Sequence, residues 1–263
     1  CSIGIVMTYS ASAIYADQIM GSANFFLVRQ ASYFLMGAVL LVCFAFINPL
    51  FLQRYSRLII LVAILFLVSV YCPFISQTTR GTRRWLVILG TNFQPAEFSK
   101  LALCIYLADY LSRKERIIAR GSILTFVPPL IILCVISMLI LVQPDLGTVV
   151  ILFLLASILF FLSGICHRYI WCLGLIGALI SYFAIIKVPY RVNRIVAYLD
   201  PWSDPQGSGF QIIQSFLAFA LGGGQGVGLG KSTQKLFYLP QGYTDFIFSI
   251  IGEEAGLAGT AAV

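Results

Sequence analysis

The chain has 263 residues, of which 60% are hydrophobic and only 10% are charged, and its mean hydropathy is +0.95. A water-soluble chain of this length would need far more charged side chains to cover its surface. The composition therefore excludes a soluble globular protein and indicates an integral membrane protein. The formal net charge is +7, but we expect no nucleic-acid partner.

Apolar runs recur along the chain, and most are long enough to cross a bilayer, which takes about 20 residues. Complete spans are predicted at 25–47, 58–75, 95–111, 122–142, 146–166 and 169–186, with partial spans at 1–15 and 246–263. Each run is predicted to be a helix, because backbone polar groups find no water within lipid. The expected fold class is an all-α polytopic transmembrane bundle of about eight spans, which forms a single integral membrane domain over residues 1–263.

We expect this domain to be truncated at both ends. The chain begins without Met inside an apolar run, and it stops at Val263 before the last predicted helix could cross. No signal peptide with a basic n-region and a small-residue cleavage site is visible.

Basic residues bear on the orientation in the membrane. If the first helix runs outward, three basic loops face the cytoplasm, as the positive-inside rule asks, at 48–57, 112–121 and 164–168. The opposite face then carries Arg80, Arg83 and Arg84 in one short loop, so charge alone leaves the orientation open. Outward arginines favour an anionic ligand, because guanidinium forks match phosphate oxygens. The alternative is that they anchor at lipid headgroups.

The span that starts at Pro95 is the least lipid-like. Pro95 suits a first helical turn, because that position needs no N–H partner. Glu97 and Lys100 lie three residues apart and share one helix face as an ion pair. Such a pair at a span end marks either a polar cavity or a clamp between helices, and the nearby arginine loop favours the cavity. Trp85 in that loop could stack on a sugar ring, although by itself it favours the interfacial aromatic belt.

Gln143, Pro144 and Asp145 join two predicted spans with almost no loop. Asp145 is expected to cap the next helix by accepting backbone N–H bonds, with Thr148 in the first turn. A catalytic role would require Asp145 to face the same cavity as Glu97. We therefore favour the capping role.

The one sizeable polar region covers residues 187–245, which we expect to form a large extracytoplasmic loop. Its first part carries Arg191 and Arg194. Apolar residues recur with helical spacing near 208–221, which predicts an amphipathic helix on the membrane surface. A glycine-rich stretch then leads to Lys231, and its glycines suit a mobile loop that approaches a bulky substrate closely.

Asp245 lies where this polar loop stops and an apolar helix begins. A carboxylate at that depth is costly to keep charged, so it usually has a task or a definite partner. The simpler alternative is that Asp245 caps the helix that starts near Phe246, and it can serve both purposes.

Six motifs together resemble the SEDS family (shape, elongation, division and sporulation) of bacterial cell-wall synthesis, nearly end to end. They are GIVMTYSAS at 4–12, RW at 84–85, QPAEFSK at 94–100, QPDLGT at 143–148, DPWSDPQGSGFQ at 200–211, and TDFIF with GEE at 244–254. The residues of these motifs are more similar to those of the cell-division member of the family than to those of the elongation member. The chain departs from the usual family pattern at Phe237 and Gln241, where relatives carry acidic residues, and at Tyr243, which replaces a common histidine. These changes bear on regulation more than on chemistry.

The resemblance implies a ten-helix bundle, of which this chain holds about eight helices, in the bacterial cytoplasmic membrane. It also implies a peptidoglycan glycosyltransferase that polymerises lipid II at the outer membrane face during cell division. The implied partners are lipid II, a class B penicillin-binding protein and other cell-division membrane proteins.

Glycosyl transfer from a lipid diphosphate needs a base for the acceptor hydroxyl and positive charge for the leaving pyrophosphate. Asp245 is the expected catalytic base. The predicted substrate-binding residues are Arg80, Arg83, Arg84, Trp85, Glu97, Lys100, Asp145, Arg191, Arg194 and Lys231. No protein metal site is predicted, although this chemistry admits a divalent cation, Mg²⁺ or Mn²⁺, as a cofactor.

Two other functions stay open. A lipid II flippase or transporter could use Glu97, Lys100, Asp145 and Glu253 to line a path through the bundle. A non-catalytic scaffold of the division machinery could recruit a penicillin-binding protein through apolar helix surfaces. Polymerase residues would gather at one membrane face and transport residues at mid-depth. The strongest set here gathers at one face, which favours the polymerase.

Overall fold

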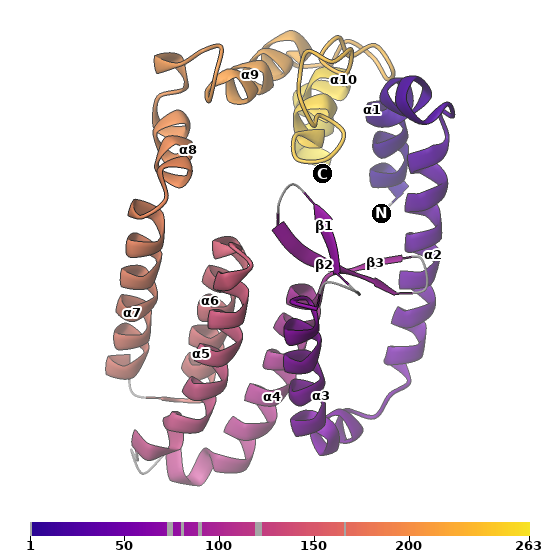
Figure 1. Cartoon of the computed structure of the whole chain (residues 1–263). Helices are drawn as coiled ribbons and strands as arrows, with labels where there is room; N and C mark the ends of the chain where they lie inside the picture. The colour runs from indigo at the N-terminus through magenta and orange to yellow at the C-terminus, as the bar shows by residue number, and fades with distance from the viewer. Residues whose placement is uncertain (1, 73–75, 80–81, 89–90, 119–122, 166) are drawn as a thin grey trace. The chain divides into compact units, whose positions relative to one another are not determined.

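The computed structural model describes residues 2–72, 76–79, 82–88, 91–118, 123–165 and 167–263 (Figure 1). The chain forms two compact units, which are described separately. The central unit is Ile47–Lys187, and the terminal unit combines Cys1–Phe46 with Val188–Val263. Arg80, one of the predicted ligand-binding arginines, lies outside the described residues.

Five long helices are found among the described residues of the central unit. They are α3 (Pro49–Ser69), α4 (Pro95–Ile118), α5 (Val127–Val142), α6 (Leu146–Leu162) and α7 (His167–Ile186), with a 3₁₀ turn η1 (Ile123–Phe126) before α5. The α3 helix starts earlier than the predicted span at residue 58. Asn48 explains this start, because its side chain accepts a hydrogen bond from the Leu50 N–H at 2.9 Å and Pro49 occupies the first turn.

A small antiparallel sheet precedes α4, and the all-α prediction did not anticipate it. Its strands are β1 (Ser76–Thr79), β2 (Thr82–Ile88) and β3 (Thr91–Phe93), in the order β1-β2-β3. Threonine, aromatic and β-branched residues are frequent in this segment, and they suit a pleated surface. Trp85 of β2 pairs with Gln77 of β1, and Arg83 pairs with the next β1 residue, Thr78, so Arg84 is the extra residue of a β-bulge. The regular alternation of side chains along β2 is interrupted at this position.

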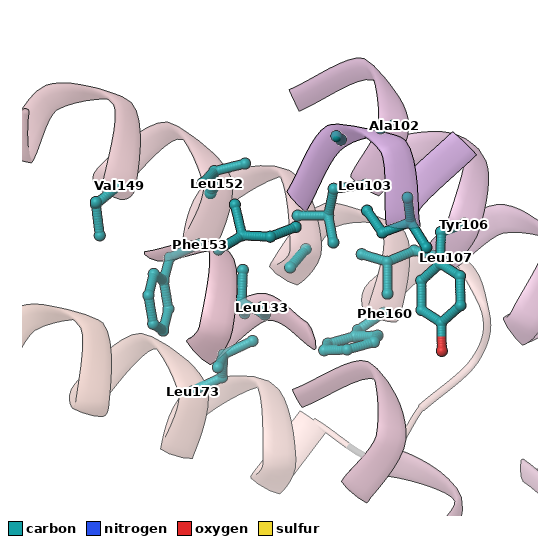
Figure 2. Packing of buried hydrophobic residues seen from close by; sticks show 14 of the residues in the cluster. Ala102, Leu103, Tyr106, Leu107, Leu133, Val149, Leu152, Phe153, Phe160 and Leu173 are labelled. Atoms are coloured by element: carbon teal, nitrogen blue, oxygen red, sulfur yellow. The ribbon is translucent and has the colours of Figure 1, made fainter. Parts of the chain in front are cut away.

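The core of the central unit forms around α4. Ala102, Leu103 and Leu107 are fully buried, at the spacing of one helix face, and Figure 2 shows them with side chains of α5, α6 and α7. The Leu133 and Leu152 side chains meet them from α5 and α6. Apolar residues therefore hold α4 to its neighbours, although this helix also carries Glu97 and Lys100.

The terminal unit combines both ends of the chain. Its helices are α1 (Ser2–Met20), α2 (Phe25–Ala45), α8 (Pro189–Leu199), α9 (Phe210–Gly222) and α10 (Ile247–Ala262), with a 3₁₀ turn η2 (Pro201–Ser203) between α8 and α9. The α9 helix matches the helix predicted near 208–221. It packs against α10, where Gly222 lies so close to Gly252 that a Cβ at position 222 would overlap the Gly252 carbonyl. Its predicted place on the membrane surface stays a prediction.

The turn before α9 is organised by Asp204. Its carboxylate accepts hydrogen bonds from the Ser208 N–H at 2.8 Å, the Ser208 hydroxyl at 3.1 Å and the Gly207 N–H at 3.1 Å. These bonds, led by the Ser208 N–H, lower the pKa of Asp204 below its usual value. A Cβ at Gly207 would collide with this carboxylate, and one at Gly209 with the Pro201 carbonyl. The glycines of the DPWSDPQGSGFQ motif are therefore required by close packing.

The α10 helix is interrupted at Gly256, where φ is +65° and ψ is −163°. The carbonyls of Glu253 and Glu254 instead accept hydrogen bonds from Val227 and Gly228 N–H groups, at 2.9 and 3.0 Å. Beyond the break, helix N–H groups in turn donate to the glycine-rich loop, from Leu257 to Gly223 at 2.9 Å and from Ala258 to Gly224 at 3.4 Å. Backbone groups of the loop thus replace the hydrogen-bond partners that α10 residues lose at the break.

Each of the eight predicted spans contains a helix, namely α1 to α7 and α10. Among the described residues, four helical segments are long and apolar enough to cross a membrane: 25–45, 49–69, 124–142 and 167–186. The α6 helix is strongly apolar but shorter. The chain is therefore a helical, multi-pass membrane protein.

Candidate active site

Asp245 is exposed on the terminal unit, at the end of the long loop that leads into α10. The N-cap residue of α10 is Phe246, so Asp245 lies one position before the cap. The capping position that the sequence offered for Asp245 is thus occupied by its neighbour. An accessible carboxylate at the start of a helix can reach a substrate from the loop side.

The backbone around Asp245 is held by one carbonyl. The Gln241 carbonyl oxygen accepts hydrogen bonds from the N–H of Thr244 at 3.1 Å, the N–H of Phe246 at 3.4 Å and the hydroxyl of Thr244 at 3.3 Å. Gln241 itself has a φ of +58°, which is uncommon for a residue other than glycine. Asp245 therefore lies between two fastened residues in a tight turn.

Aromatic rings anchor the same turn to the N-terminal helices. The Tyr243 ring lies 4.5 Å from Tyr15 of α1 and 5.3 Å from Phe26 of α2, measured between centroids. The Phe237 ring lies 6.0 Å from Tyr15. Two of the three departures from the family pattern thus have a packing role, because aromatic pairs at these distances stabilise their contacts. Their pairing with Tyr15 could not be predicted, because Tyr15 lies at the other end of the chain.

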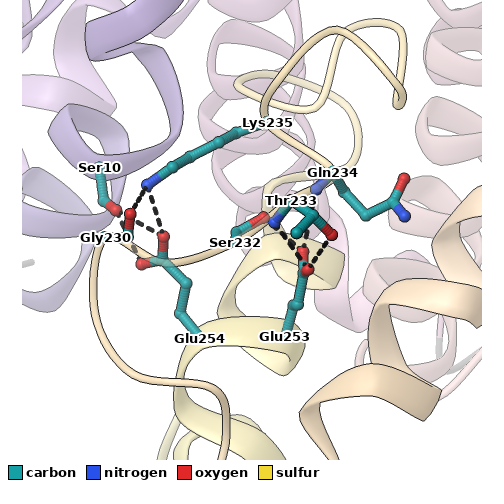
Figure 3. A network of polar contacts seen from close by, with 8 residues as sticks. All are labelled: Ser10, Gly230, Ser232, Thr233, Gln234, Lys235, Glu253 and Glu254. Atoms are coloured by element: carbon teal, nitrogen blue, oxygen red, sulfur yellow. Dashed lines mark hydrogen bonds and ion pairs between the residues drawn. The ribbon is translucent and has the colours of Figure 1, made fainter.

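Residues 232–235, in the loop that leads to Asp245, are bound to α10 by two adjacent carboxylates (Figure 3). Glu253 accepts hydrogen bonds from the Ser232 hydroxyl, from the Thr233 N–H and hydroxyl at 2.8 Å each, and from the Gln234 N–H at 3.3 Å. Glu254 forms an ion pair with Lys235 at 3.0 Å. Both carboxylates are enclosed, with exposures of 0% and 1%.

The predicted basic residues of the terminal unit lie on α8 and on the loop. Arg194 is exposed on α8 and its guanidinium lies 5.3 Å from the Tyr190 ring centroid, whereas Arg191 is half-buried. Lys231 is exposed just before the segment that Glu253 holds. Lys231 and Asp245 thus belong to the two ends of one loop segment, 231–245, which packs on α10.

Arg84 has a structural task in the central unit. Its Nε donates to the Gln143 carbonyl at 2.8 Å and its Nη2 to the Pro144 carbonyl at 2.7 Å. The guanidinium fork therefore ties the sheet to the α5–α6 turn. Arg83, the neighbour of Arg84 on β2, is exposed and therefore more accessible to a ligand, and Trp85 is partly exposed.

The ion pair predicted on α4 is present, with Lys100 Nζ 2.8 Å from Glu97 Oε2. Glu97 is 59% exposed and Lys100 22% exposed, so this pair is accessible and not sealed in the core. It also lies within one helix, which does not fit a clamp between helices.

Asp145 acts as the N-cap of α6, as the sequence predicted. Its carboxylate accepts hydrogen bonds from the Thr148 N–H at 3.3 Å and the Thr148 hydroxyl at 2.9 Å.

The sequence reasoning missed a buried polar cluster between α3 and α4. Asp109 is 6% exposed and accepts hydrogen bonds from Ser56 at 2.5 Å and from Arg113 Nε at 2.6 Å. The spacing of Asp109 and Arg113 by four residues was the available signal. Within the described ranges, no three His, Cys, Asp or Glu side chains gather as a metal site.

Comparison with known proteins decides the family. The family model of FtsW, RodA and SpoVE, described as "Cell cycle protein", matches residues 1–263. The chain belongs to the FtsW/RodA/SpoVE family. This is the SEDS family that the motifs indicated.

Relatives within this family are identical to the chain at about two fifths of the aligned residues. A probable peptidoglycan glycosyltransferase FtsW of Geobacter sulfurreducens is 41% identical over 260 residues, which cover 99% of this chain and 69% of that protein. Stage V sporulation protein E of Bacillus subtilis is 39% identical over 261 residues, with 98% and 70% covered.

Solved structures of the family share the fold. A chain in a structure described as a peptidoglycan synthase complex that coordinates polymerization and crosslinking has a TM-score of 0.69 and 27% identity. The match covers 98% of this chain and 72% of that one. The rod shape determining protein RodA of Thermus thermophilus has a TM-score of 0.60 at 19% identity, with 99% and 68% covered, and supports the fold alone.

Proposed function

We propose that this chain is the catalytic core of an FtsW-type peptidoglycan glycosyltransferase, which polymerises lipid II into glycan strands during cell division. Membership of the FtsW/RodA/SpoVE family carries this proposal, together with the names of the FtsW relatives. The accessible Asp245 on a fastened loop provides a residue for the chemistry. The proposed location is the cytoplasmic membrane, with the 187–245 loop on its outer face.

In this mechanism Asp245 is the general base. Its carboxylate takes the proton of the acceptor sugar hydroxyl, and the freed oxygen forms a bond to the anomeric carbon of the donor. The bond between that carbon and the lipid diphosphate breaks, and the diphosphate leaves with the electron pair. Positive charge near the leaving group stabilises it, and Lys231, Arg191 and Arg194 of the terminal unit are the proposed sources.

The proposed protein partner is a class B penicillin-binding protein, with other division proteins of the membrane. The synthase complex among the structural relatives supports this, because its description couples polymerization to crosslinking. The apolar outer faces of α2 and α7 provide surface for contacts with other membrane helices.

The structure gives less support to a transporter. Asp145 caps α6, and Glu253 is enclosed by hydrogen bonds from the 232–234 backbone and side chains. Both carboxylates are thus engaged within their own units. An open translocation path needs polar groups that a passing substrate can reach.

A divalent cation, Mg²⁺ or Mn²⁺, remains part of the proposal only as a cofactor to be tested. The described residues offer no group of three side-chain ligands, so no step above depends on it. Adding a chelator to the polymerisation assay, and then restoring Mg²⁺ or Mn²⁺, tests this requirement directly.

The decisive substitution is Asp245→Asn in the full-length protein with its penicillin-binding protein. Asparagine is nearly isosteric but cannot take the hydroxyl proton, and removal of a general base typically lowers the rate by about 10²–10⁴-fold. We expect lipid II binding and partner binding to persist, while glycan chains almost disappear from the products of the polymerisation assay, as separated on a gel.

Asp17→Asn is the matched control, because Asp17 is an exposed carboxylate on α1 of the same unit. It should polymerise like the unaltered protein. Near-normal polymer from Asp245→Asn would remove Asp245 from the mechanism. Lipid transport without polymer by the unaltered protein would support the flippase instead.

A further inference from the structure

Two buried carboxylates outside the proposed chemistry lie side by side on α10, and each contacts a different part of the 231–245 segment. Glu253 holds Ser232, Thr233 and Gln234, while Glu254 holds Lys235 (Figure 3). Charged side chains are almost never fully buried unless they are paired, so this double burial requires a reason. Loop attachment is the reason that the contacts provide.

Glu253 is surrounded by the donors of a turn. Its oxygens accept the N–H groups of Thr233 and Gln234 and the hydroxyls of Ser232 and Thr233. A carboxylate is well suited to this task, because hydrogen bonds to a charged acceptor are stronger than those to a neutral one. Lys231 directly precedes this turn, so Glu253 determines where the Lys231 backbone lies.

Glu254 joins three segments of the terminal unit. Its oxygens accept hydrogen bonds from the Ser10 hydroxyl of α1, at 2.8 and 2.7 Å, and from Lys235 Nζ at 3.0 Å. The same ammonium group donates to the Gly230 carbonyl at 2.5 Å, and the Lys235 side chain is only 7% exposed. This buried pair therefore connects the loop, α1 and α10 at one point.

The α10 helix sets the spacing between these contacts and Asp245. Asp245 immediately precedes the N-cap Phe246, and Glu253 lies seven residues further along the helix, which corresponds to a rise of about 10 Å. The far end of the segment is fastened by the Gln241 carbonyl and by the buried Gly242, which packs against Ile250 of α10. Both ends of the 231–245 segment are thus attached to the same helix, α10.

We propose that Glu253 and Glu254 are positioning residues that fix the 231–245 segment on α10, so that Lys231 and Asp245 are held at a set separation. The inference rests on the proposed glycosyltransferase function. The two glutamates do not contact the reacting atoms. They act through the loop, and small misplacements of catalytic groups can lower a rate by about 10²-fold.

The first arm of the test measures the loop itself. Glu253→Gln keeps the size of the side chain but replaces one of its two acceptor oxygens by an NH2 group, which cannot accept the turn donors. In the full-length protein we expect faster hydrogen exchange at the amides of Thr233 and Gln234, and little change in α2. Unchanged exchange at both amides would overturn the role of Glu253.

The second arm is a double-substitution cycle on the buried pair. Lys235→Met alone leaves a buried carboxylate without its ammonium, which should lower the folded yield. Lys235→Met with Glu254→Gln removes both charges, so the yield should recover. Glu115→Gln, at an exposed carboxylate of α4, is the matched control.

The kinetics of the double variant separate positioning from stability. We expect kcat for lipid II polymerisation at least 10-fold below the unaltered protein, with KM within about 2-fold, although the protein is folded. A double variant that folds and keeps the unaltered kcat would overturn the inference. If the unaltered protein makes no polymer, the proposed function fails, and the exchange arm still decides whether the carboxylates hold the loop.

Discussion

At the scale of single residues, charged side chains that the sequence suggests as ligand-binding groups can also stabilise the fold through hydrogen bonds. Arg84 shows this most clearly, because two carbonyls of the α5–α6 turn accept its Nε–H and Nη2–H groups. Its neighbour Arg83 is exposed. The sequence could not separate the two arginines, since neither the strand nor its β-bulge at Arg84 was predicted for this segment.

Arg84→Lys tests this division of roles. Lysine keeps the charge but loses the planar fork, so at least one carbonyl is left without its donor, at a cost of about 1 kcal/mol. We expect a lower midpoint of thermal unfolding in detergent for Arg84→Lys. Arg83→Lys is the neighbouring control and should unfold like the unaltered protein. The same midpoint for both variants would contradict the structural role of Arg84 in tying the sheet to the α5–α6 turn.

At the scale of elements, the predictable features were those with a local cause. Eight helices followed from apolar runs, and the Asp145 cap followed from its position before a helix. The sheet at 76–93 was missed because it is short and lies between spans. The contacts of Glu254 were missed because Ser10 lies 244 residues away in the sequence, so no local spacing reports them. Asp245 could be singled out because it interrupts an otherwise apolar boundary.

The broken α10 helix supplies an element-scale prediction. Gly226 has a φ of +80°, and a Cβ there would approach the Glu254 carbonyl to 2.3 Å, so alanine cannot fit without moving the loop. Left-handed backbone alone costs an alanine about 1–3 kcal/mol. We expect Gly226→Ala to lower the thermal stability and to expose the 223–228 loop to proteolysis.

Gly224→Ala provides the matched control for this change. Gly224 lies in the same loop, a Cβ there would meet no atom within 4 Å, and its φ is not positive. Its alanine variant should resist the protease as the unaltered protein does. Equal cleavage of the two variants would contradict the described hydrogen bonding between the 223–228 loop and the break in α10.

At the scale of the whole molecule, the orientation in the membrane decides whether the proposed base can meet its substrate. The 187–245 loop must face outward if Asp245 is to act on lipid II at the outer surface. The basic loops at 48–57, 112–121 and 164–168, which the predicted topology places on the opposite side, agree with this, because Arg and Lys are enriched on the cytoplasmic side. The outward arginines of the 76–93 segment oppose it, so charge does not decide.

Single cysteines in a background without the seven native cysteines test the orientation. Asn193→Cys places a thiol on the exposed side of α8, and Glu115→Cys places one near the end of α4. In intact cells, a reagent that cannot cross the membrane should label the cysteine at 193 and spare the one at 115. Both should react after the membrane is opened, which controls for accessibility. The reverse pattern in intact cells would place Asp245 on the cytoplasmic side and exclude it as the base for polymerisation at the outer surface.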